Sequence, residues 1–370
     1  MQRGSFWSAV FTLVAVTIGA GIFGLPFVVA KAGFFTGIFV LVLVGILTAI
    51  ISLYLGEIVL RTKGKHQLSG LAGIYFGMKG KFLVFGASLL SWYGALFAYI
   101  LGAGKILTTL WNIDGVFAGW IFWTVLGFLL LFDLKYFIIL ESILTPLKIV
   151  SVLLLSVIVF HFIHGENLSG FSLSKIPIVY GIILFSYLGI SAIPEMALEL
   201  KNKKELKKAI LTGIGICAII YFFYILAFIG AFGMNQEEIS LVSLKNINTF
   251  LFIFGNVFAL LSLSSSFLGL GFSLKDTFIL DFKQGKYYSW LYIFGVLAFL
   301  LVINIKSFVK VLEFTGVVGG GLCLLMIVVM HSFAQKYGKR KPEFSIKENN
   351  FLKYLLFALI FFGIFYELFL

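Results

Sequence analysis

Long apolar stretches, separated by short polar turns, recur along the whole chain. A helix that crosses the ~30 Å hydrocarbon layer of a membrane needs about 17–25 residues, and eleven stretches reach that length. They lack the alternation of apolar and polar residues that marks the strands of a membrane β-barrel. The pattern predicts an all-α membrane protein with helices at about residues 5–31, 33–60, 81–111, 115–132, 136–164, 176–200, 204–233, 247–280, 287–303, 307–334 and 351–370.

The polar connections between these stretches are too short to form a soluble domain. None exceeds about 20 residues, so residues 1–370 are interpreted as one transmembrane transporter domain. The longest connection, Arg61 to Lys81, contains HQLSGLAGIYFGM and is predicted to form an amphipathic helix on the membrane surface.

Composition and charge agree with a membrane location. Hydrophobic residues make up 61% of the chain and charged residues 12%, with a mean hydropathy of +1.09, whereas a soluble domain is roughly 45–50% apolar and 25% charged. The net charge of +12 comes from short lysine clusters between apolar stretches, which argues against nucleic-acid binding. With a cytoplasmic N-terminus, 21 of the 28 Lys and Arg face the cytoplasm, as expected for a multi-pass protein of the cell membrane. An odd number of spans then places the C-terminus outside.

Two apolar stretches carry glycine and proline in the middle of a span. Residues 17–26 read TIGAGIFGLP and residues 185–194 read FSYLGISAIP, so the pattern Gly-Ile-x-x-Leu/Ile-Pro occurs twice, 168 residues apart. Glycine and proline weaken a helix, so both spans are predicted to be discontinuous. Matched interruptions indicate a repeat, and five helices per copy make the copies inverted across the membrane. The predicted copies are 1–164 and 176–334, followed by an extra helix at 351–370.

Such breaks predict a binding site at the bilayer midplane. Irregular backbone is tolerated at membrane depth only where it lines a cavity, and its freed amides and carbonyls can then bind a ligand. Amides after the first break suit a carboxylate, and carbonyls at both breaks suit an ammonium group. A single interrupted span can also be a kink that serves packing, but the matched pair favours a site for a zwitterion.

Three stretches resemble known transporter families. TIGAGIFGLP resembles the first-helix signature of the amino acid–polyamine–organocation superfamily. SYLGISAIPEMALELKNKKELKKAI (186–210) resembles the sixth-to-seventh helix region of amino acid/auxin permeases, and SLSSSFLGLGFSLKDTF (262–278) the eighth helix of aromatic amino acid permeases. The resemblance implies a LeuT-like fold, with a 5+5 inverted repeat and helices 1 and 6 discontinuous. It also implies secondary active transport of neutral hydrophobic or aromatic amino acids by alternating access.

The same resemblance implies the substrate-binding residues. The substrate carboxylate is expected on the amides of Ala20, Gly21 and Ile22. The amine is expected on the carbonyls of Thr17, Ile18, Phe185 and Leu188. The remaining candidates are Gly19, Ser186, Tyr187 and Gly189 in the breaks and Tyr93 on the third span. Because bulk at Gly21 would block the carboxylate position, a leucine there is predicted to abolish transport.

The sixth span departs from the family pattern at Ser191. Many relatives carry a glutamate there, so a mechanism that depends on that carboxylate is weakened. Glu195 is the next acid along the helix. It either replaces the missing glutamate or pairs with the lysines that begin at Lys201, and the second interpretation is favoured.

Lys148 is the one basic residue that the topology leaves deep in a span. It lies 13 residues beyond Lys135, which is ~20 Å along a helix, and a charge at the bilayer centre costs at least about 2.5–3.5 kcal/mol. Its setting, LKIVSV, resembles that of sodium-independent relatives in which a fifth-helix lysine replaces a sodium ion. The implied partners are carbonyls near Gly19 and the hydroxyls of Ser265 and Ser266. Transport without sodium follows, with the proton as candidate coupling ion; the alternative is a lysine that only reaches a water-filled crevice.

Other function classes fit the sequence less well. An intramembrane enzyme would need a nucleophile, base or metal cluster at depth, so no catalytic residue, metal or cofactor is expected. His161 and His164 lack a third ligand nearby. A channel would be expected to offer repeated pore loops or charged rings. The alternatives left open are a polyamine, nucleobase or inorganic ion as the substrate of the same fold, and sodium-coupled amino acid symport.

Overall fold

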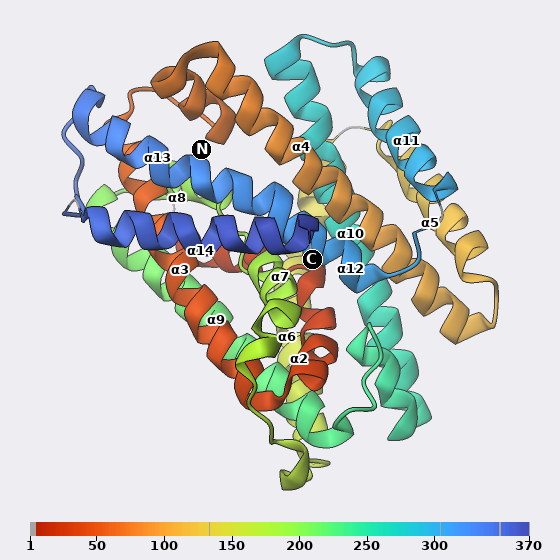
Figure 1. Cartoon of the computed structure of the whole chain (residues 1–370). Helices are drawn as coiled ribbons and strands as arrows, with labels where there is room; N and C mark the ends of the chain where they lie inside the picture. The colour runs from red at the N-terminus through yellow and green to blue at the C-terminus, as the bar shows by residue number, and fades with distance from the viewer. Residues whose placement is uncertain (1–4, 133, 304, 348, 370) are drawn as a thin grey trace.

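The computed structural model describes residues 5–132, 134–303, 305–347 and 349–369, which form fourteen α-helices with short 3₁₀ and π segments between them (Figure 1). The first half contains α1 (Phe6–Thr17), α2 (Leu25–Ala32), α3 (Phe34–Arg61), α4 (Leu68–Trp111), α5 (Gly115–Leu129) and α6 (Leu134–Phe160). The second half contains α7 (Ile176–Ser186), α8 (Ala192–Glu199), α9 (Leu206–Phe232), α10 (Thr249–Phe282), α11 (Lys286–Val302), α12 (Phe308–Phe314), α13 (Gly321–Tyr337) and α14 (Asn350–Phe369). The predicted all-α architecture is confirmed.

The helices suit a membrane in length and composition. Six are long and apolar enough to cross it, and α1 together with the bent segment Ala20–Ala32 makes a seventh candidate span. Four shorter apolar helices accompany them, at Gly115–Leu129, Pro146–Phe160, Leu173–Ser186 and Lys286–Val302. Helix is therefore present in each of the eleven predicted ranges. The number of crossings and the inverted repeat stay predictions.

Large apolar side chains also cover the outside of the bundle. Phe250 on α10 is 73% exposed and Phe351 on α14 is 77% exposed. In water such a surface would drive aggregation, whereas lipid accepts it without a hydrophobic penalty. The exposed apolar surface thus supports the membrane assignment independently of the sequence pattern.

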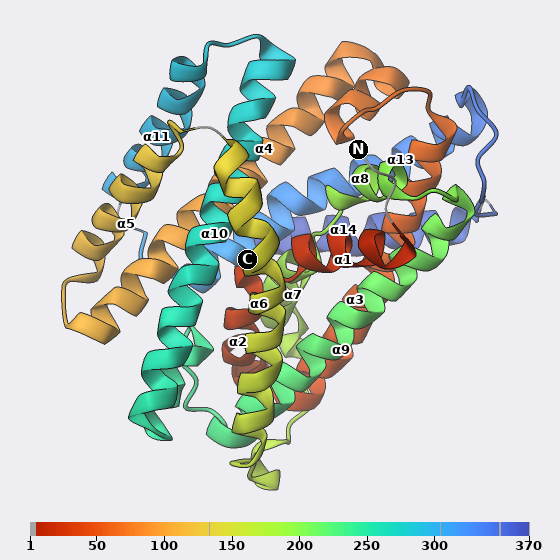
Figure 2. The same ribbon diagram turned by 180° about the vertical axis from the view of Figure 1, so that it is seen from behind.

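The central helices are those that carry the predicted breaks. In both views α3 and α9 run side by side, while α5 and α11 lie at the edge of the molecule next to α4 and α10 (Figures 1 and 2). The first broken span packs against the second, since α1 contacts α8 and α2 contacts α7. The interrupted segments therefore lie in the interior of the bundle and not on its lipid-facing surface.

The predicted helix between Arg61 and Lys81 is present at residues 68–76, and a kink at Gly77 sets it apart from the third span within α4. Residues 68–76 form a helical segment that joins the third span at Gly77 within α4. Gly77 has φ +70° and ψ −164°, a backbone conformation that only glycine adopts without strain. The glycine therefore redirects the chain by a sharp kink between this helix and the third span.

A buried carboxylate fastens α3 to α13 and to the segment that follows α13. Glu57 is fully buried, and its oxygens accept hydrogen bonds from Arg61 Nε (2.8 Å), Ser345 Oγ (2.8 Å) and the Ile346 amide (2.7 Å). His331 Nε2 lies 3.0 Å from Oε2, the same oxygen that accepts from the Ile346 amide. A buried charge is tolerated only when it is paired and hydrogen-bonded in this way, so the cluster fixes this end of the bundle.

Replacing Glu57 with glutamine is expected to lower the free energy of unfolding by about 3 kcal/mol, because Arg61 would keep its charge and lose its buried partner. Thermal unfolding of the detergent-purified protein, followed by tryptophan fluorescence, measures the loss. Glu343→Gln is the matched control, since Glu343 pairs with Arg340 at the surface and exposed pairs contribute about 0–1 kcal/mol. Equal effects of the two substitutions would contradict this assignment.

Candidate functional site

The first span is broken where the sequence predicts. Helix α1 ends at Thr17, Gly19 is extended (φ −105°, ψ −155°), and a 3₁₀ turn, Ala20–Gly24, leads into α2. The two parts of the span are bent by 48°. Pro26 lies in the first turn of α2, where its missing N–H would have no intrahelical partner in any case. The predicted interruption near Gly19 to Gly21 is confirmed.

The sixth span is broken in the same manner. Helix α7 ends at Ser186, residues 187–191 form turns, and α8 starts at Ala192 with Pro194 in its first turn. The amide of Gly189 bonds to the carbonyl of Tyr187 (2.7 Å) in place of a carbonyl one helical turn back. The predicted interruption at Tyr187 to Gly189 is therefore also confirmed.

The two breaks lie directly against each other, and each glycine packs on the other span. A Cβ added to Gly21 would lie 2.5 Å from Ser186 Oγ and 3.2 Å from Ser186 Cα. A Cβ added to Gly189 would overlap the hydroxyl of Thr17. Each glycine of the repeated motif thus fills the space beside the last helical residue of the opposite span. The structure brings these four predicted residues, Thr17, Gly21, Ser186 and Gly189, together.

The buried backbone groups at this junction are of the two kinds that the ends of a zwitterion need. Ala20 and Gly21 begin a 3₁₀ turn, and the first amides of such a turn have no intrahelical carbonyl to bind. The carbonyls of Thr17 and Ser186 stand at the ends of α1 and α7. Donors that suit a carboxylate therefore lie on one side of the first break, and acceptors that suit an ammonium group lie at both breaks.

A tyrosine that the sequence did not single out joins the two breaks. Tyr221, fully buried on α9, places its hydroxyl 2.9 Å from the carbonyl oxygen of Thr17 and 2.6 Å from that of Ser186. Its ring meets the ring of Tyr187 edge to face, with centroids 5.3 Å apart. Tyr221 lies in the apolar run CAIIYFFYILAF, and nothing in that run distinguishes it from a packing aromatic.

The aromatic residue of α4 that lies beside the first break is Tyr99. A Cβ on Gly19 would lie 4.0 Å from the Tyr99 hydroxyl, and Tyr99 is buried. Tyr93 is half-buried nearly two turns earlier, and its neighbour Gly94 packs on Thr315. A substrate-binding role for Tyr93 stays a prediction, and Tyr99 is an additional candidate.

Thr315 opens a π-helical turn, Thr315–Gly320, which the sequence analysis did not anticipate. Three of its glycines pack so closely on neighbouring segments that no side chain would fit. A Cβ on Gly316 would lie 2.7 Å from Phe185 Cβ, and a Cβ on Gly320 would overlap the side chain of Leu188. Gly319 packs against Ser91 of α4. π turns are found frequently at functional sites. The run TGVVGGG was the available signal for this close packing.

The predicted ion-coupling residues lie on neighbouring helices. Lys148, 9% exposed, belongs to α6, which packs against α10, the helix that carries Ser265 and Ser266. The hydroxyl of Ser265 is buried and has no hydrogen-bond partner among the described residues, so the expected bond between Lys148 and Ser265 is not formed. An ion-coupling role for these three residues stays a prediction.

The acids of the sixth span have different surroundings. Glu195 is exposed and forms no ion pair with Lys201 within the described residues. The favoured interpretation of Glu195 as a partner of those lysines is therefore not seen. Glu199 lies one turn further, and the Thr12 hydroxyl donates to its carboxylate, with oxygen–oxygen distances of 3.0 and 3.1 Å, which links α8 to α1.

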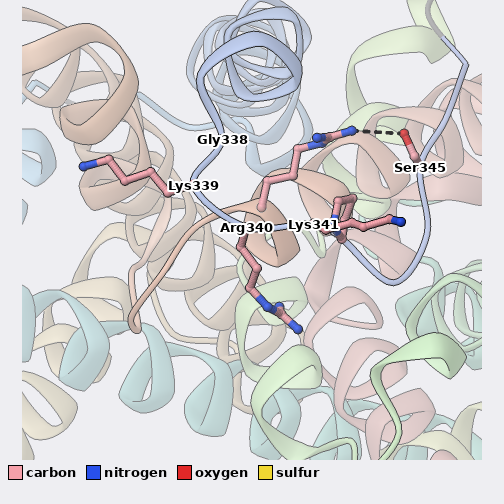
Figure 3. A pocket seen from close by; sticks show the side chains of 7 residues that line it. Gly338, Lys339, Arg340, Lys341 and Ser345 are labelled. Atoms are coloured by element: carbon pink, nitrogen blue, oxygen red, sulfur yellow. Dashed lines mark hydrogen bonds between the residues drawn. The ribbon is translucent and has the colours of Figure 1, made fainter.

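Two surface cavities lie away from the breaks. One, of about 470 Å³, is lined by Arg61, residues 338–342 and Ser345, and Lys339 and Lys341 point from it in opposite directions (Figure 3). The other, of about 350 Å³, shares Arg340 and includes Lys63 and Lys203. These basic linings offer no counterpart for an ammonium group, so neither cavity suits a zwitterion as well as the junction of the breaks does.

Comparison with solved structures supports the fold. The crystal structure of MhsT in complex with L-phenylalanine matches 99% of this chain and 100% of its own, with a TM-score of 0.67 and 16% sequence identity. At that identity the likeness establishes a shared fold, which is LeuT-like as predicted.

Comparison of sequences supplies the family. No match is found among curated proteins. The family model described as the tryptophan/tyrosine permease family matches residues 2–369, nearly the whole length. The expectation of a membrane transporter of amino acids, and not an enzyme, is thereby confirmed. The chain belongs to the tryptophan/tyrosine permease family.

Proposed function

We propose that this permease moves tryptophan, tyrosine and other neutral hydrophobic amino acids across the cell membrane by alternating access. The observation that carries the proposal is the junction of two broken spans at Gly21 and Gly189, in a chain of the tryptophan/tyrosine permease family. The structural relative MhsT was crystallised with L-phenylalanine, a substrate of the same chemical class.

The backbone at the junction recognises the parts common to all amino acids. The amides of Ala20, Gly21 and Ile22 bind the carboxylate at the start of the 3₁₀ turn, where the partial positive charge of a helix start favours an anion. The ammonium group binds the carbonyls that the family resemblance implies, those of Thr17, Ile18, Phe185 and Leu188. The Ser186 carbonyl, at the end of α7, joins them. Ser191 stands at the position of the sixth span where an acid would favour cationic side chains, so the pocket selects neutral ones.

Aromatic side chains around the junction recognise the substrate side chain. Tyr99 lies beside Gly19, and Tyr187 is buried with a hydroxyl that has no hydrogen-bond partner within the described part of the chain. Ring stacking on such side chains contributes about 0.5–1.5 kcal/mol beyond area burial. The Tyr187 hydroxyl can also form a hydrogen bond with the substrate side chain. Tyrosine offers a hydroxyl for this bond and tryptophan offers an indole N–H.

The paired halves of the broken spans form the moving unit. On one side of the junction Glu199 of α8 bonds to Thr12 of α1. On the other side α2 packs against α7, and Lys175 Nζ donates to the carbonyl of Lys31 (3.0 Å). The two spans thus move together about the site, which opens it to one face of the membrane and then to the other. The proposed topology has eleven membrane crossings in a 5+5 inverted repeat with one extra helix, and its N-terminus lies in the cytoplasm.

Transport is proposed to need no sodium. Lys148 belongs to α6, which packs against α10, and the family resemblance puts either a lysine or a sodium ion near these helices. The buried hydroxyl of Ser265 provides an oxygen ligand there. The proton remains the proposed coupling ion.

The substrate class is tested by uptake into proteoliposomes. Labelled tryptophan and tyrosine should accumulate without sodium, and unlabelled phenylalanine and leucine should compete. Arginine and putrescine should compete at least about 100-fold less well, because a second charge buried without a partner costs several kcal/mol. Strong competition by arginine or putrescine would refute the proposed specificity, and a strict sodium requirement would refute the proposed coupling.

A further inference from the structure

The Tyr221 hydroxyl holds one hydrogen between two acceptors. The carbonyl oxygens of Thr17 and Ser186 lie 2.9 and 2.6 Å away, and both are hydrogen-bond acceptors only. The hydroxyl can donate its single hydrogen fully to one of them at a time. The Thr17 carbonyl also accepts the Gly19 amide (2.9 Å), whereas Tyr221 is the one donor that the described residues offer to the Ser186 carbonyl. Whenever the hydroxyl turns to Thr17, the Ser186 carbonyl therefore lacks a donor.

A substrate ammonium group can donate to both carbonyls at once, which the single hydroxyl of Tyr221 cannot do. It brings three N–H donors and a positive charge, and hydrogen bonds to a charged donor are roughly twice as strong as neutral ones. The two carbonyls that Tyr221 contacts are among those proposed above for the substrate amine. Substrate and tyrosine thus compete for the same two oxygens.

We propose that the Tyr221 hydroxyl is an internal stand-in for the substrate ammonium group. It satisfies the carbonyls of Thr17 and Ser186 while the site is empty, gives way when an amino acid binds, and returns as the amino acid leaves. This inference rests on the proposed function. It makes Tyr221 a positioning residue whose hydroxyl holds the two breaks together during the return of the empty carrier.

The inference predicts opposite changes in affinity and turnover. In Tyr221→Phe the buried Ser186 carbonyl would have no donor among the described residues, and the Thr17 carbonyl would keep only the Gly19 amide; an unsatisfied buried group is costly. Binding of tryptophan would relieve that cost, so its Kd is expected to fall about tenfold. Because no hydroxyl would help to displace the substrate, kcat for transport should fall as well. A residue that serves packing alone would weaken binding or leave it unchanged.

Two matched controls separate this effect from simple loss of a buried hydroxyl. Tyr224→Phe removes an equally buried hydroxyl from the same helix, one that bonds to Ser240 (2.6 Å) and not to a break. Its Kd for tryptophan should equal that of the unmutated protein. Indole-3-propionate, which is tryptophan without its ammonium group, should bind the unmutated protein and Tyr221→Phe with equal affinity.

A native thiol reports the state of the breaks in the empty protein. Cys217 is buried one helical turn before Tyr221, next to the Thr17 hydroxyl. In a Cys323→Ser background, methyl methanethiosulfonate should label Cys217 about tenfold faster in Tyr221→Phe than in Tyr221 protein, since the two carbonyls then have no common donor. Tryptophan should slow the labelling of both.

These measurements decide the inference. A higher or unchanged Kd for tryptophan in Tyr221→Phe, or an equal gain for indole-3-propionate, would overturn it. Should Tyr221→Phe fail to fold, 3-fluorotyrosine at position 221 serves instead: its hydroxyl is a stronger donor, so tryptophan should bind more weakly, and tighter binding would overturn the inference. If the unmutated protein binds neither tryptophan nor tyrosine, the proposed function is wrong. The rate of Cys217 labelling then still tests whether Tyr221 holds the two breaks together. An equal labelling rate in Tyr221→Phe and in the unmutated protein would contradict that role of Tyr221.

Discussion

Gly21→Leu is expected to abolish the binding and uptake of tryptophan while the protein stays folded in the membrane. Even a single added carbon at this position would lie 2.5 Å from Ser186 Oγ and 3.0 Å from Phe185 Cδ1, closer than real Cβ contacts come. A leucine must push the two breaks apart, which removes the amides of the first break from the carboxylate position. Affinity should fall by about 100-fold or more, equivalent to at least about 2.7 kcal/mol.

The control for this substitution lies on a neighbouring helix. Gly215 of α9 is half-buried, and nothing lies within 4 Å of the place that its Cβ would take. Gly215→Leu should therefore keep the affinity for tryptophan, which isothermal calorimetry on purified protein can measure beside Gly21→Leu. The affinity of Gly21→Ala for tryptophan should lie between those of Gly21→Leu and Gly215→Leu. Wild-type affinity in Gly21→Leu would remove the first break from the substrate site.

Lys148→Ala is expected to eliminate sodium-independent uptake. The substitution removes a buried cationic side chain from α6, a helix that packs on α10. Without the charge of Lys148, the empty carrier either cannot complete its transport cycle or binds a sodium ion at the place of the lysine ammonium group. Uptake of labelled tryptophan in potassium buffer should fall to background, and sodium should restore part of it if the vacancy accepts the ion.

Lys353→Ala is the matched control for the loss of a buried lysine. Lys353 of α14 is 8% exposed and bonds to Ser332 Oγ (2.7 Å), away from the breaks. Its removal should leave the ion dependence of uptake unchanged. Full proton-driven uptake by Lys148→Ala would show that Lys148 is not the coupling group.

The breaks could be predicted from sequence because glycine and proline act through local backbone physics. Gly19, Gly21 and Pro26 disfavour a continuous helix wherever they occur, and the second copy at Gly189 and Pro194 made a chance kink improbable. The same local information predicted which residues lie at the junction. It could not predict that Gly21 faces Ser186 and Gly189 faces Thr17, because those contacts depend on how distant spans are packed.

Residues with long-range partners escaped prediction for the same reason. Tyr221 is one aromatic among several in α9, and only its distance to the two carbonyls sets it apart. Glu57 lies near the end of an apolar stretch, where an acid would ordinarily reach water; instead it is fully buried against His331 and residues 345–346. Hydropathy patterns report the depth of a residue in a span but carry no information about its partner on another span.

The π turn in the tenth span has a consequence for how the gene can change. A π turn holds one residue more than an α turn at the same place, so losing one residue between Thr315 and Gly320 would restore a regular α-helix there. A π turn rotates by a smaller angle per residue than an α turn, so the extra residue is absorbed within it, and the deletion would leave α13 facing the same way relative to α12. His331 would keep its place 3.0 Å from Glu57. A single-codon insertion, by contrast, would rotate α13 by about 100° relative to α12. Single-codon deletions in this glycine run should thus be tolerated better than single-codon insertions.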